Sequence, residues 1–273
     1  MVLLHTSTVL VLLLLLVSVM AVMHAVATAP STGHDGDESA LLDFKAKVSS
    51  HSGALASWSQ NSSASYCSWE GVMCGRKHPW RVVALDLPSR GLAGTISPAI
   101  GNLTILRTLN LSFNALHGEI PQSIGSLRRL RYLDLGDNSL TGEIPSNISR
   151  CTSLQVMFIG HNQGLQGNIP AKIGNMPMLR VLDLSNNSIT GTIPASLGNL
   201  SRLVDLTLAI NHLEGSIPQG IGNNPHLQYL QLSINHLSGV LPPSLYNLSS
   251  PENFRGREHS AWTTPTRFWN NPS

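Results

Sequence analysis

The chain has 273 residues, of which 12% are charged, and its formal net charge is +2. Charged residues usually make up about a quarter of a globular domain, so this fold must depend on apolar packing and hydrogen bonds. A nearly neutral chain also lacks the basic surface that binds a polyanion, and we expect no nucleic-acid partner.

The chain begins with an apolar leader. The first 29 residues contain no Lys, Arg, Asp or Glu, and the segment 9–26 is almost wholly apolar. Small residues at Ala27 and Ala29 end this segment with the A-x-A spacing that signal peptidase prefers. We therefore predict a signal peptide over residues 1–29, cleaved after Ala27 or Ala29. An uncleaved signal anchor is the alternative, because only the amino terminus and His5 supply positive charge before the apolar run. No later run reaches the ~20 apolar residues of a membrane helix, so no other transmembrane segment is predicted.

An N-terminal cap is predicted over residues 30–80. Asp37 is placed to cap a helix. Three apolar residues of this helix share one face at helical spacing: Leu41, Phe44 and Val48.

Cysteine spacing adds a covalent clamp to this cap. Cys67 and Cys74 are close in the chain and flanked by aromatic residues, so we predict a disulfide between them. Three tryptophans are expected to complete the lid: Trp58, Trp69 and Trp80. A zinc site formed with His78 would lack a fourth ligand, and no metal is expected. Cys151 is predicted to be a buried, inert side chain.

Residues 81–250 form a repeat of about 24 residues. Framework leucines begin the units at Leu106, Leu130, Leu154, Leu179, Leu203 and Leu227, and a degenerate unit precedes them from Val82. Each unit follows L-x-x-L-x-L-x-x-N-x-L-x-G-x-I-P, and only the unit at Leu154 is longer, by one residue. These are seven leucine-rich repeats, which must stack into one continuous core because no single unit can bury its leucines alone.

The spacing within a unit predicts its local structure. L-x-L places both leucines on one face of a short strand. The asparagine that follows can satisfy turn backbone inside the stack, at Asn114, Asn138, Asn162, Asn187, Asn211 and Asn235. The glycine permits a tight bend, and the I-P step favours extended backbone. The fold class is therefore an α/β-type repeat solenoid, a horseshoe with short parallel strands on its concave face.

The repeat ends abruptly near the C-terminus. The register predicts a framework leucine at position 251, where the chain has Pro251. Residues 251–273 contain no Leu, Ile or Val. We predict a non-repeat, disordered tail.

The motifs resemble one family. D-E-S-A-L-L-D-F-K-A-K from Asp37, C-S-W-E-G-V-M-C from Cys67 and the G-x-I-P repeats are similar to the ectodomains of plant leucine-rich-repeat receptor-like kinases, in particular the innate-immunity group. The resemblance covers about Glu38 to Ser250. It implies a glycoprotein of defence or development signalling, secreted to the apoplast or held at the plasma membrane in a full receptor. No kinase motif follows the repeats, so the resemblance does not extend kinase activity to this chain.

Candidate binding residues lie on the exposed strand positions. Aromatic rings offer contact area and carboxylates offer partners for basic groups. The candidates are Tyr132, Asp134, Asp137, Phe158, His161, Asp183, Asp205 and Tyr229.

Sequons of the type N-x-S/T agree with a secretory route. We predict glycans at Asn61, Asn102, Asn147, Asn199 and Asn247. Two further sequons, at Asn110 and Asn186, fall on the presumed binding face, where a glycan would obstruct a ligand.

The function predicted from the sequence is recognition without catalysis. Motifs for hydrolases, metalloproteases, nucleotide binding and kinases are absent, and no catalytic residue or cofactor is expected. We expect a peptide or protein ligand, with a co-receptor ectodomain as a further partner, bound by a truncated or decoy receptor. The alternatives are a secreted inhibitor of pathogen polygalacturonases and a truncated product without function.

Overall fold

The computed structural model describes residues 33–50, 53–59 and 65–247, apart from a few side chains at the ends. Contacts divide the chain into two units, Met1–Gly36 and Asp37–Ser273, and almost all described residues lie in the second. The predicted signal peptide, the sequon at Asn61 and the predicted tail lie outside the described residues.

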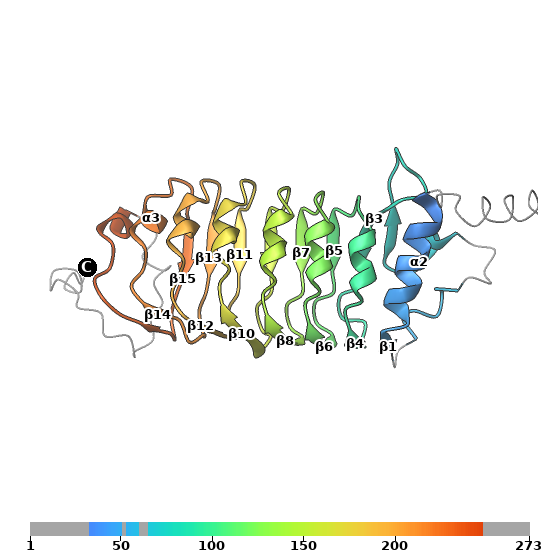
Figure 1. Ribbon diagram of the computed structural model, residues 1–273, viewed down its shortest axis with the longest axis horizontal. Coiled ribbons are helices and arrows are strands. Elements are labelled where there is room, and N and C mark those ends of the chain that lie inside the picture. The colour runs from blue at the N-terminus through green and yellow to red at the C-terminus, as the bar shows by residue number, and fades with distance from the viewer. Residues whose placement is uncertain (1–32, 51–52, 60–64, 248–273) are drawn as a thin grey trace, which may run out of the picture. The chain divides into compact units, whose positions relative to one another are not determined.

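Two long sheets run through the second unit (Figure 1), and a separate two-stranded sheet continues the smaller one. The larger sheet contains, in spatial order, β2 (Val72–Cys74), β3 (Val82–Asp86), β5 (Thr108–Asn110), β7 (Tyr132–Asp134), β9 (Val156–Phe158), β11 (Val181–Asp183), β13 (Asp205–Thr207) and β15 (Tyr229–Gln231). All of its pairings are parallel except the one between β2 and β3. The predicted short parallel strands are confirmed.

The smaller sheet was not predicted. It contains β1 (Val48–Ser50), β4 (Leu92–Thr95), β6 (Ala115–Glu119), β8 (Ser139–Glu143), β10 (Gly164–Asn168) and β12 (Ser188–Thr190). Further along, β14 (Glu214–Gly215) pairs with β16 (His236–Leu237). Apart from β1, which lies in the cap, these strands use the segment before the I-P step of each unit, and the glycine in that segment adopts positive φ, for example 75° at Gly118.

Short helices connect the two kinds of strand. Within the repeats they are η2 (Pro98–Asn102), η3 (Gln122–Ser126), η4 (Ser146–Arg150), η5 (Ala171–Asn175), η6 (Ala195–Asn199), α3 (Gln219–Gly222) and η7 (Pro243–Asn247). From η3 to α3 the residue before the helix is the proline of the I-P step, and its backbone is extended, as predicted.

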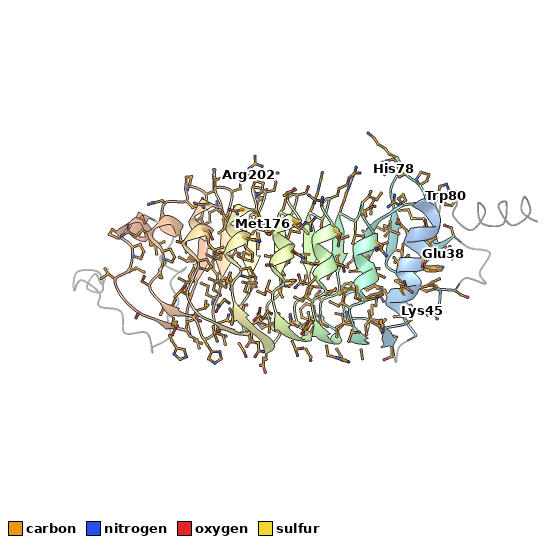
Figure 2. The ribbon with its side chains drawn as sticks, viewed as in Figure 1. Glu38, Lys45, His78, Trp80, Met176 and Arg202 are labelled. Atoms are coloured by element: carbon orange, nitrogen blue, oxygen red, sulfur yellow. A yellow bond between two sulfur atoms is a disulfide. The ribbon has the colours of Figure 1, made fainter. Side chains whose placement is uncertain are left out.

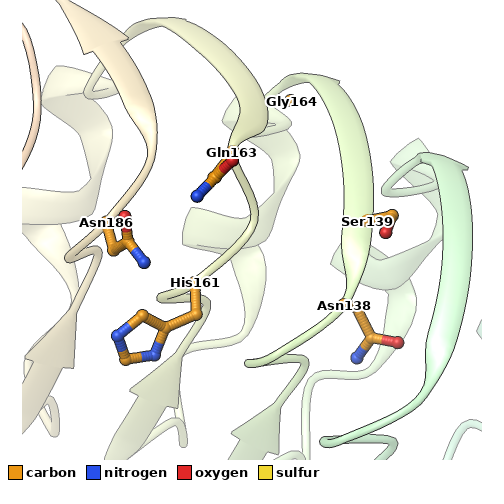
Figure 3. Close-up of a pocket in the computed structure, with 6 residues that line it drawn as sticks. All are labelled: Asn138, Ser139, His161, Gln163, Gly164 and Asn186. Carbon is orange, nitrogen blue, oxygen red and sulfur yellow. The ribbon is translucent and has the colours of Figure 1, made fainter.

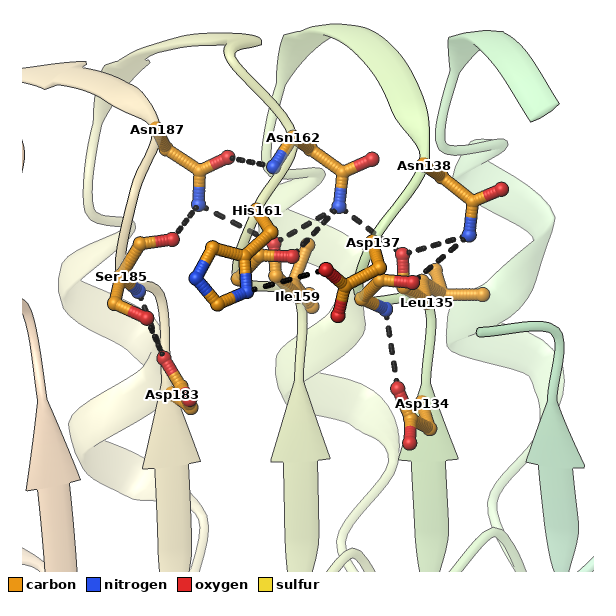
Figure 4. Close-up of polar contacts among 12 residues, drawn as sticks. Asp134, Leu135, Asp137, Asn138, Ile159, His161, Asn162, Asp183, Ser185 and Asn187 are labelled. Carbon is orange, nitrogen blue, oxygen red and sulfur yellow. Dashed lines mark hydrogen bonds and ion pairs between the residues drawn. The ribbon is translucent and has the colours of Figure 1, made fainter. Parts of the chain in front are cut away.

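The core is a continuous column of apolar side chains. The framework leucines from Leu106 to Leu227 are all buried, and one cluster joins them to the cap. A row of asparagines binds the strand ends together (Figure 4). The Nδ2 of Asn162 lies 3.0 Å from the carbonyl of Leu135 and 3.1 Å from that of Ile159, while its Oδ1 accepts from the N–H of Leu140. The predicted role of the asparagines is confirmed.

The cap differs from the prediction in its helix. Helix α2 (Gly33–Lys45) begins before Asp37, so Asp37 does not cap it. Its carboxylate is instead buried and accepts from the N–H of Val82 at 2.7 Å and from Nε of Arg81 at 3.0 Å. Val48 belongs to β1, because the helix ends at Lys45. A buried carboxylate with these partners joins the helix to the first strand of the stack.

The aromatic lid is also only partly as predicted. Trp58 and Trp69 are buried and stacked, with ring centroids 5.5 Å apart. Trp80 is 52% exposed and lies outside the lid. Its place is taken by Tyr66 of η1 (Tyr66–Ser68), whose ring meets Trp69 edge-on. Whether an aromatic side chain is buried depends on the path of the backbone around it. Its position in the sequence does not reveal that path in a segment without regular periodicity.

The cysteines are as predicted. Cys67 and Cys74 form a disulfide, which excludes both sulfurs from a zinc site. Cys151 is buried and its thiol donates to the carbonyl of Ile124. Burial raises the pKa of Cys151 to about 11, so the thiol stays protonated and unreactive at neutral pH.

Candidate functional site

Three of the predicted binding residues come together on the larger sheet. Tyr132 of β7 and Phe158 of β9 meet edge to face, with ring centroids 6.1 Å apart and planes inclined at 70°. The hydroxyl of Tyr132 donates to Oδ2 of Asp134 at 3.0 Å. All three side chains are half-buried. We call these three residues the aromatic cluster.

The electrostatics of the aromatic cluster are set by burial. Burial raises the pKa of Asp134, while hydrogen bonds from Gly136 N–H and Tyr132 lower it. Burial and the neighbouring Asp134 carboxylate raise the pKa of Tyr132 to about 12. Tyr132 is therefore a proton donor at neutral pH, and both oxygens of Asp134 already accept a hydrogen bond within the protein.

The other strand-face aspartates are also engaged locally. Oδ1 of Asp183 accepts from the N–H of Ser185 at 2.8 Å and from its hydroxyl at 2.6 Å (Figure 4). Oδ1 of Asp205 accepts from the hydroxyl of Thr207 at 3.1 Å, and burial raises the pKa of Asp205. Asp183 thus uses one oxygen to hold the end of β11, whereas Asp205 joins the first residue of β13 to the last.

The predicted residues are spread over five strands and do not form a single site. Asp183 lies opposite Phe158 in register, next to the aromatic cluster. Tyr229 lies on β15, three strands beyond β9, or about 14 Å at the usual strand spacing. Its hydroxyl contacts Oε1 of Gln231 instead.

Asp137 and His161 form a separate pair beyond the strands. Nδ1 of His161 lies 3.5 Å from Oδ1 of Asp137, and both residues are at the surface. Both adopt positive φ, as do their counterparts in the other units: Ser89, Phe113, Asn186, Ile210 and Ile234. Side chains other than glycine seldom adopt this conformation. The sequence did not reveal it, because the residue types at this position vary from unit to unit.

A polar cavity of about 250 Å³ lies beside His161 (Figure 3). Its lining was missed apart from His161, and consists of Asn138, Ser139, His161, Gln163, Gly164 and Asn186. Gln163 and Gly164 fall where the unit at Leu154 has its extra residue. The irregular length of this unit was the sequence signal that could have located the cavity. An added residue in a tight turn must widen that turn.

The extra residue also changes the asparagine row. In neighbouring units the asparagine N–H donates to a backbone carbonyl of the next unit, as Asn138 does to His161. Asn162 donates instead to the side-chain Oδ1 of Asn187 at 3.0 Å. The cavity therefore lies where a side-chain hydrogen bond, from Asn162 N–H to Asn187 Oδ1, replaces the backbone hydrogen bond found in the neighbouring units.

Among the predicted glycan sites, those in the repeats fall on the short helices. Asn102 and Asn199 end η2 and η6 and are exposed, whereas Asn147 is half-buried in η4. The side chain of Asn247 lies outside the described residues. Within the described part of the chain, no group of three or more His, Cys, Asp or Glu side chains is placed to hold a metal ion.

Family models match most of the described chain. A model for a leucine-rich repeat region matches residues 79–212, one for a leucine-rich repeat N-terminal domain matches 34–75, and one for a leucine-rich repeat matches 226–248.

Curated relatives are receptor kinases. The chain is 50% identical over 86 residues to the receptor kinase-like protein Xa21 of Oryza sativa subsp. japonica, and 48% identical over 84 residues to the receptor-like serine/threonine-protein kinase EFR of Arabidopsis thaliana. Each alignment covers 30% of this chain and 8% of the relative. The chain thus matches only a small part of these receptors.

Solved structures of receptor ectodomains share the fold. The PEPR1–AtPEP1 complex matches at 34% identity with a TM-score of 0.73, over 77% of this chain and 29% of that chain. The Arabidopsis receptor kinase HAESA, in complex with the peptide hormone IDA and the co-receptor SERK1, matches at 35% identity with a TM-score of 0.71, over 77% and 35%. A chain of the BIR3–SERK2 complex from Arabidopsis thaliana matches at 34% identity with a TM-score of 0.57, over 64% of this chain and 93% of that chain.

The matched regions are non-catalytic repeats, and both the cap and the repeats are matched. The chain belongs to the leucine-rich-repeat ectodomain family of plant receptor-like kinases.

Proposed function

We propose that the chain is an extracellular recognition module that binds a peptide or protein ligand on the larger sheet. The observation that carries this proposal is the aromatic cluster, which places two half-buried rings and a carboxylate on one face of the larger sheet. Rigid aromatic side chains supply contact area at low entropic cost and often dominate binding energy. The complex of HAESA with the peptide hormone IDA supports the same class of ligand.

Placement outside the cell is part of the proposal. The apolar leader favours export as a secreted or cell-surface protein, and glycans are proposed at the five sequons predicted above. Among the described residues, no helix is both long enough and apolar enough to cross a membrane. A co-receptor ectodomain is a proposed second partner, supported by the co-receptor complex of one neighbour.

A binding experiment tests the proposal. The mature chain, secreted from plant cells, is immobilised and used to select peptides from an extended-peptide library. We expect selected peptides to lose at least about tenfold in affinity on Tyr132→Ala/Phe158→Ala, because two hot-spot rings are removed. Trp80→Ala removes an aromatic ring outside the larger sheet's aromatic cluster and serves as the control. If no peptide is selected, or if both variants bind equally well, the proposal is wrong.

The finer roles require a different measurement. A decoy receptor competes with an intact receptor for ligand, whereas a polygalacturonase inhibitor lowers the rate of pectin hydrolysis. We expect the purified chain to leave fungal polygalacturonase activity unchanged and to reduce ligand-induced signalling when added to plant cells. Inhibition of the hydrolase would favour the alternative.

A further inference from the structure

Six exposed arginines lie along one edge of the larger sheet, in the segments that lead from each short helix into the next strand. These segments are 103–107, 127–131, 151–155, 176–180, 200–204 and 224–228, and they contain no Asp or Glu. The arginines are Arg107, Arg128, Arg129, Arg131, Arg180 and Arg202. We call this surface the arginine edge. Figure 2 shows Arg202 at the rim of the stack.

The backbone fixes the spacing of the arginine edge. The carbonyl of Arg107 accepts from the N–H of Arg131 at 2.8 Å, and the carbonyl of Arg180 accepts from the N–H of Val204 at 2.7 Å. Neighbouring units therefore place equivalent residues about 4.8 Å apart, the distance between hydrogen-bonded strands. Arg107 and Arg131 are held as direct neighbours.

The fold does not neutralise these charges. Among the described residues, arginines form ion pairs only at Arg81 and Arg90, both outside the arginine edge. Like charges placed directly opposite one another on neighbouring strands are destabilising. The arginine edge thus carries like charges that no ion pair among the described residues relieves.

The choice of residue indicates the kind of partner. The six segments contain no lysine. Arginine presents a planar fork that binds a carboxylate through two parallel hydrogen bonds, which an ammonium group does not. Carboxylates are therefore ligand groups that this edge fits.

Two of these strands carry an acidic residue at the opposite end. Asp134 is the last residue of β7 and Asp183 is the last residue of β11, whereas Asp205 is the first residue of β13 and lies on the arginine side. Arg131 comes directly before Tyr132. A ligand that covers the two rings therefore has arginines on one flank and Asp134 and Asp183 on the other.

We infer that the arginine edge binds acidic side chains of the peptide ligand. This inference rests on the proposed function and adds the charge pattern of the ligand. Side chains of an extended peptide alternate between two sides. A ligand with an acidic residue at every second position can therefore direct all of these residues toward the arginine edge as it runs across the strands.

The test uses a defined acidic probe. A fluorescein-labelled peptide of six Glu-Gly repeats is titrated with the full chain at low ionic strength, and a Lys-Gly peptide of equal length is titrated in parallel. We expect the acidic peptide to bind more tightly, and Arg131→Glu/Arg180→Glu to weaken its binding about tenfold, because two attractive surface pairs become repulsive. Added salt should weaken wild-type binding, since exposed charges are screened.

The control variant is Lys47→Glu/Lys172→Glu. It changes the net charge by the same amount, and both lysines are exposed and lie outside the arginine edge. We expect this variant to bind the acidic peptide within about twofold of wild type. Thermal unfolding of both variants confirms that they remain folded.

Two outcomes of the probe titrations overturn the inference, and a third comes from the library peptides. One is an equal loss of binding in the arginine variant and the lysine control, which would show that the loss comes from net charge alone. The other is an oligogalacturonate of equal charge that binds the edge more tightly than the peptide, which assigns it to an acidic polysaccharide. The proposed function fails separately, when library peptides do not respond to Tyr132→Ala/Phe158→Ala. Library peptides that respond to those substitutions but not to the arginine variant leave the proposed function standing and reject the inference.

Discussion

The cap and the repeats reach stability by different routes. In the cap each contact occurs once: Trp58 stacks on Trp69, the Asp37 carboxylate joins α2 to β3, and one disulfide closes a short loop. In the repeats the same asparagine bonds recur from unit to unit. A unique contact cannot be replaced by a neighbour, whereas a repeated contact is one of several equal terms in a sum.

The largest expected effect breaks the cap. Trp58→Ala removes a fully buried ring that packs on Phe44 and Trp69 and donates from Nε1 to the carbonyl of Glu70 at 3.0 Å. We expect a loss of about 4 kcal/mol in the free energy of unfolding, measured by urea denaturation. Trp80→Ala, at an exposed ring, should cost under about 1 kcal/mol. Similar losses in the two variants would contradict the buried lid.

The next effect breaks one unit of the repeat. Asn162→Ala removes the partner of several buried carbonyls and of the N–H of Leu140. Unsatisfied buried groups cost about 1–3 kcal/mol each before relaxation, and we expect a net loss of about 3 kcal/mol. Asn168→Ala, at an exposed asparagine of β10, should change stability by less than about 0.5 kcal/mol. A cap that still protects its amides from hydrogen exchange after Asn162→Ala would show that the two regions respond separately.

A smaller effect, of opposite sign, tests the backbone of the repeats. Ile210 is a β-branched residue at φ 57° and is 43% exposed. Ile210→Asn places a residue that tolerates this conformation, as Asn186 already does in the preceding unit. We expect a gain of about 1 kcal/mol in thermal unfolding measurements. Val240→Asn makes a similar polar exchange at another exposed site that lacks positive φ, and it should give no gain.

The smallest effect concerns pH. Burial raises the pKa of Asp134 in the folded state, so between the ordinary value of 3.8 and the raised value the folded chain binds more protons than the unfolded chain. The stabilisation is complete below the pKa of Asp134 in the unfolded chain. It is lost as pH rises through the raised pKa of the folded chain. Asp134→Asn should flatten this decline, by less than about 1 kcal/mol because the group is half-exposed. Unfolding measured from pH 3 to 7 detects it, and a wild-type stability that rises over this window relative to the variant would contradict the shift.

The features that the sequence predicted are those with a local geometric cause. Framework leucines, ladder asparagines and bend glycines each require one residue type, so their spacing predicts the strands and the core. The second sheet was missed because its strands, such as 115–119, mix small, polar and charged residues. The aromatic cluster followed from strand alternation, but the hydrogen bonds that already occupy Asp134 and Asp183 did not, because they depend on how side chains turn at the strand ends.

The extra residue at Gln163 has a consequence for how such proteins change over generations. The strands on either side, β9 and β11, still pair in parallel, and Asn187 restores the bond that the longer turn displaces. One residue can therefore be inserted in the turn after Asn162 without changing the register of the later strands. Substitutions can therefore change the lining of the polar cavity while the strand pairing on either side stays the same.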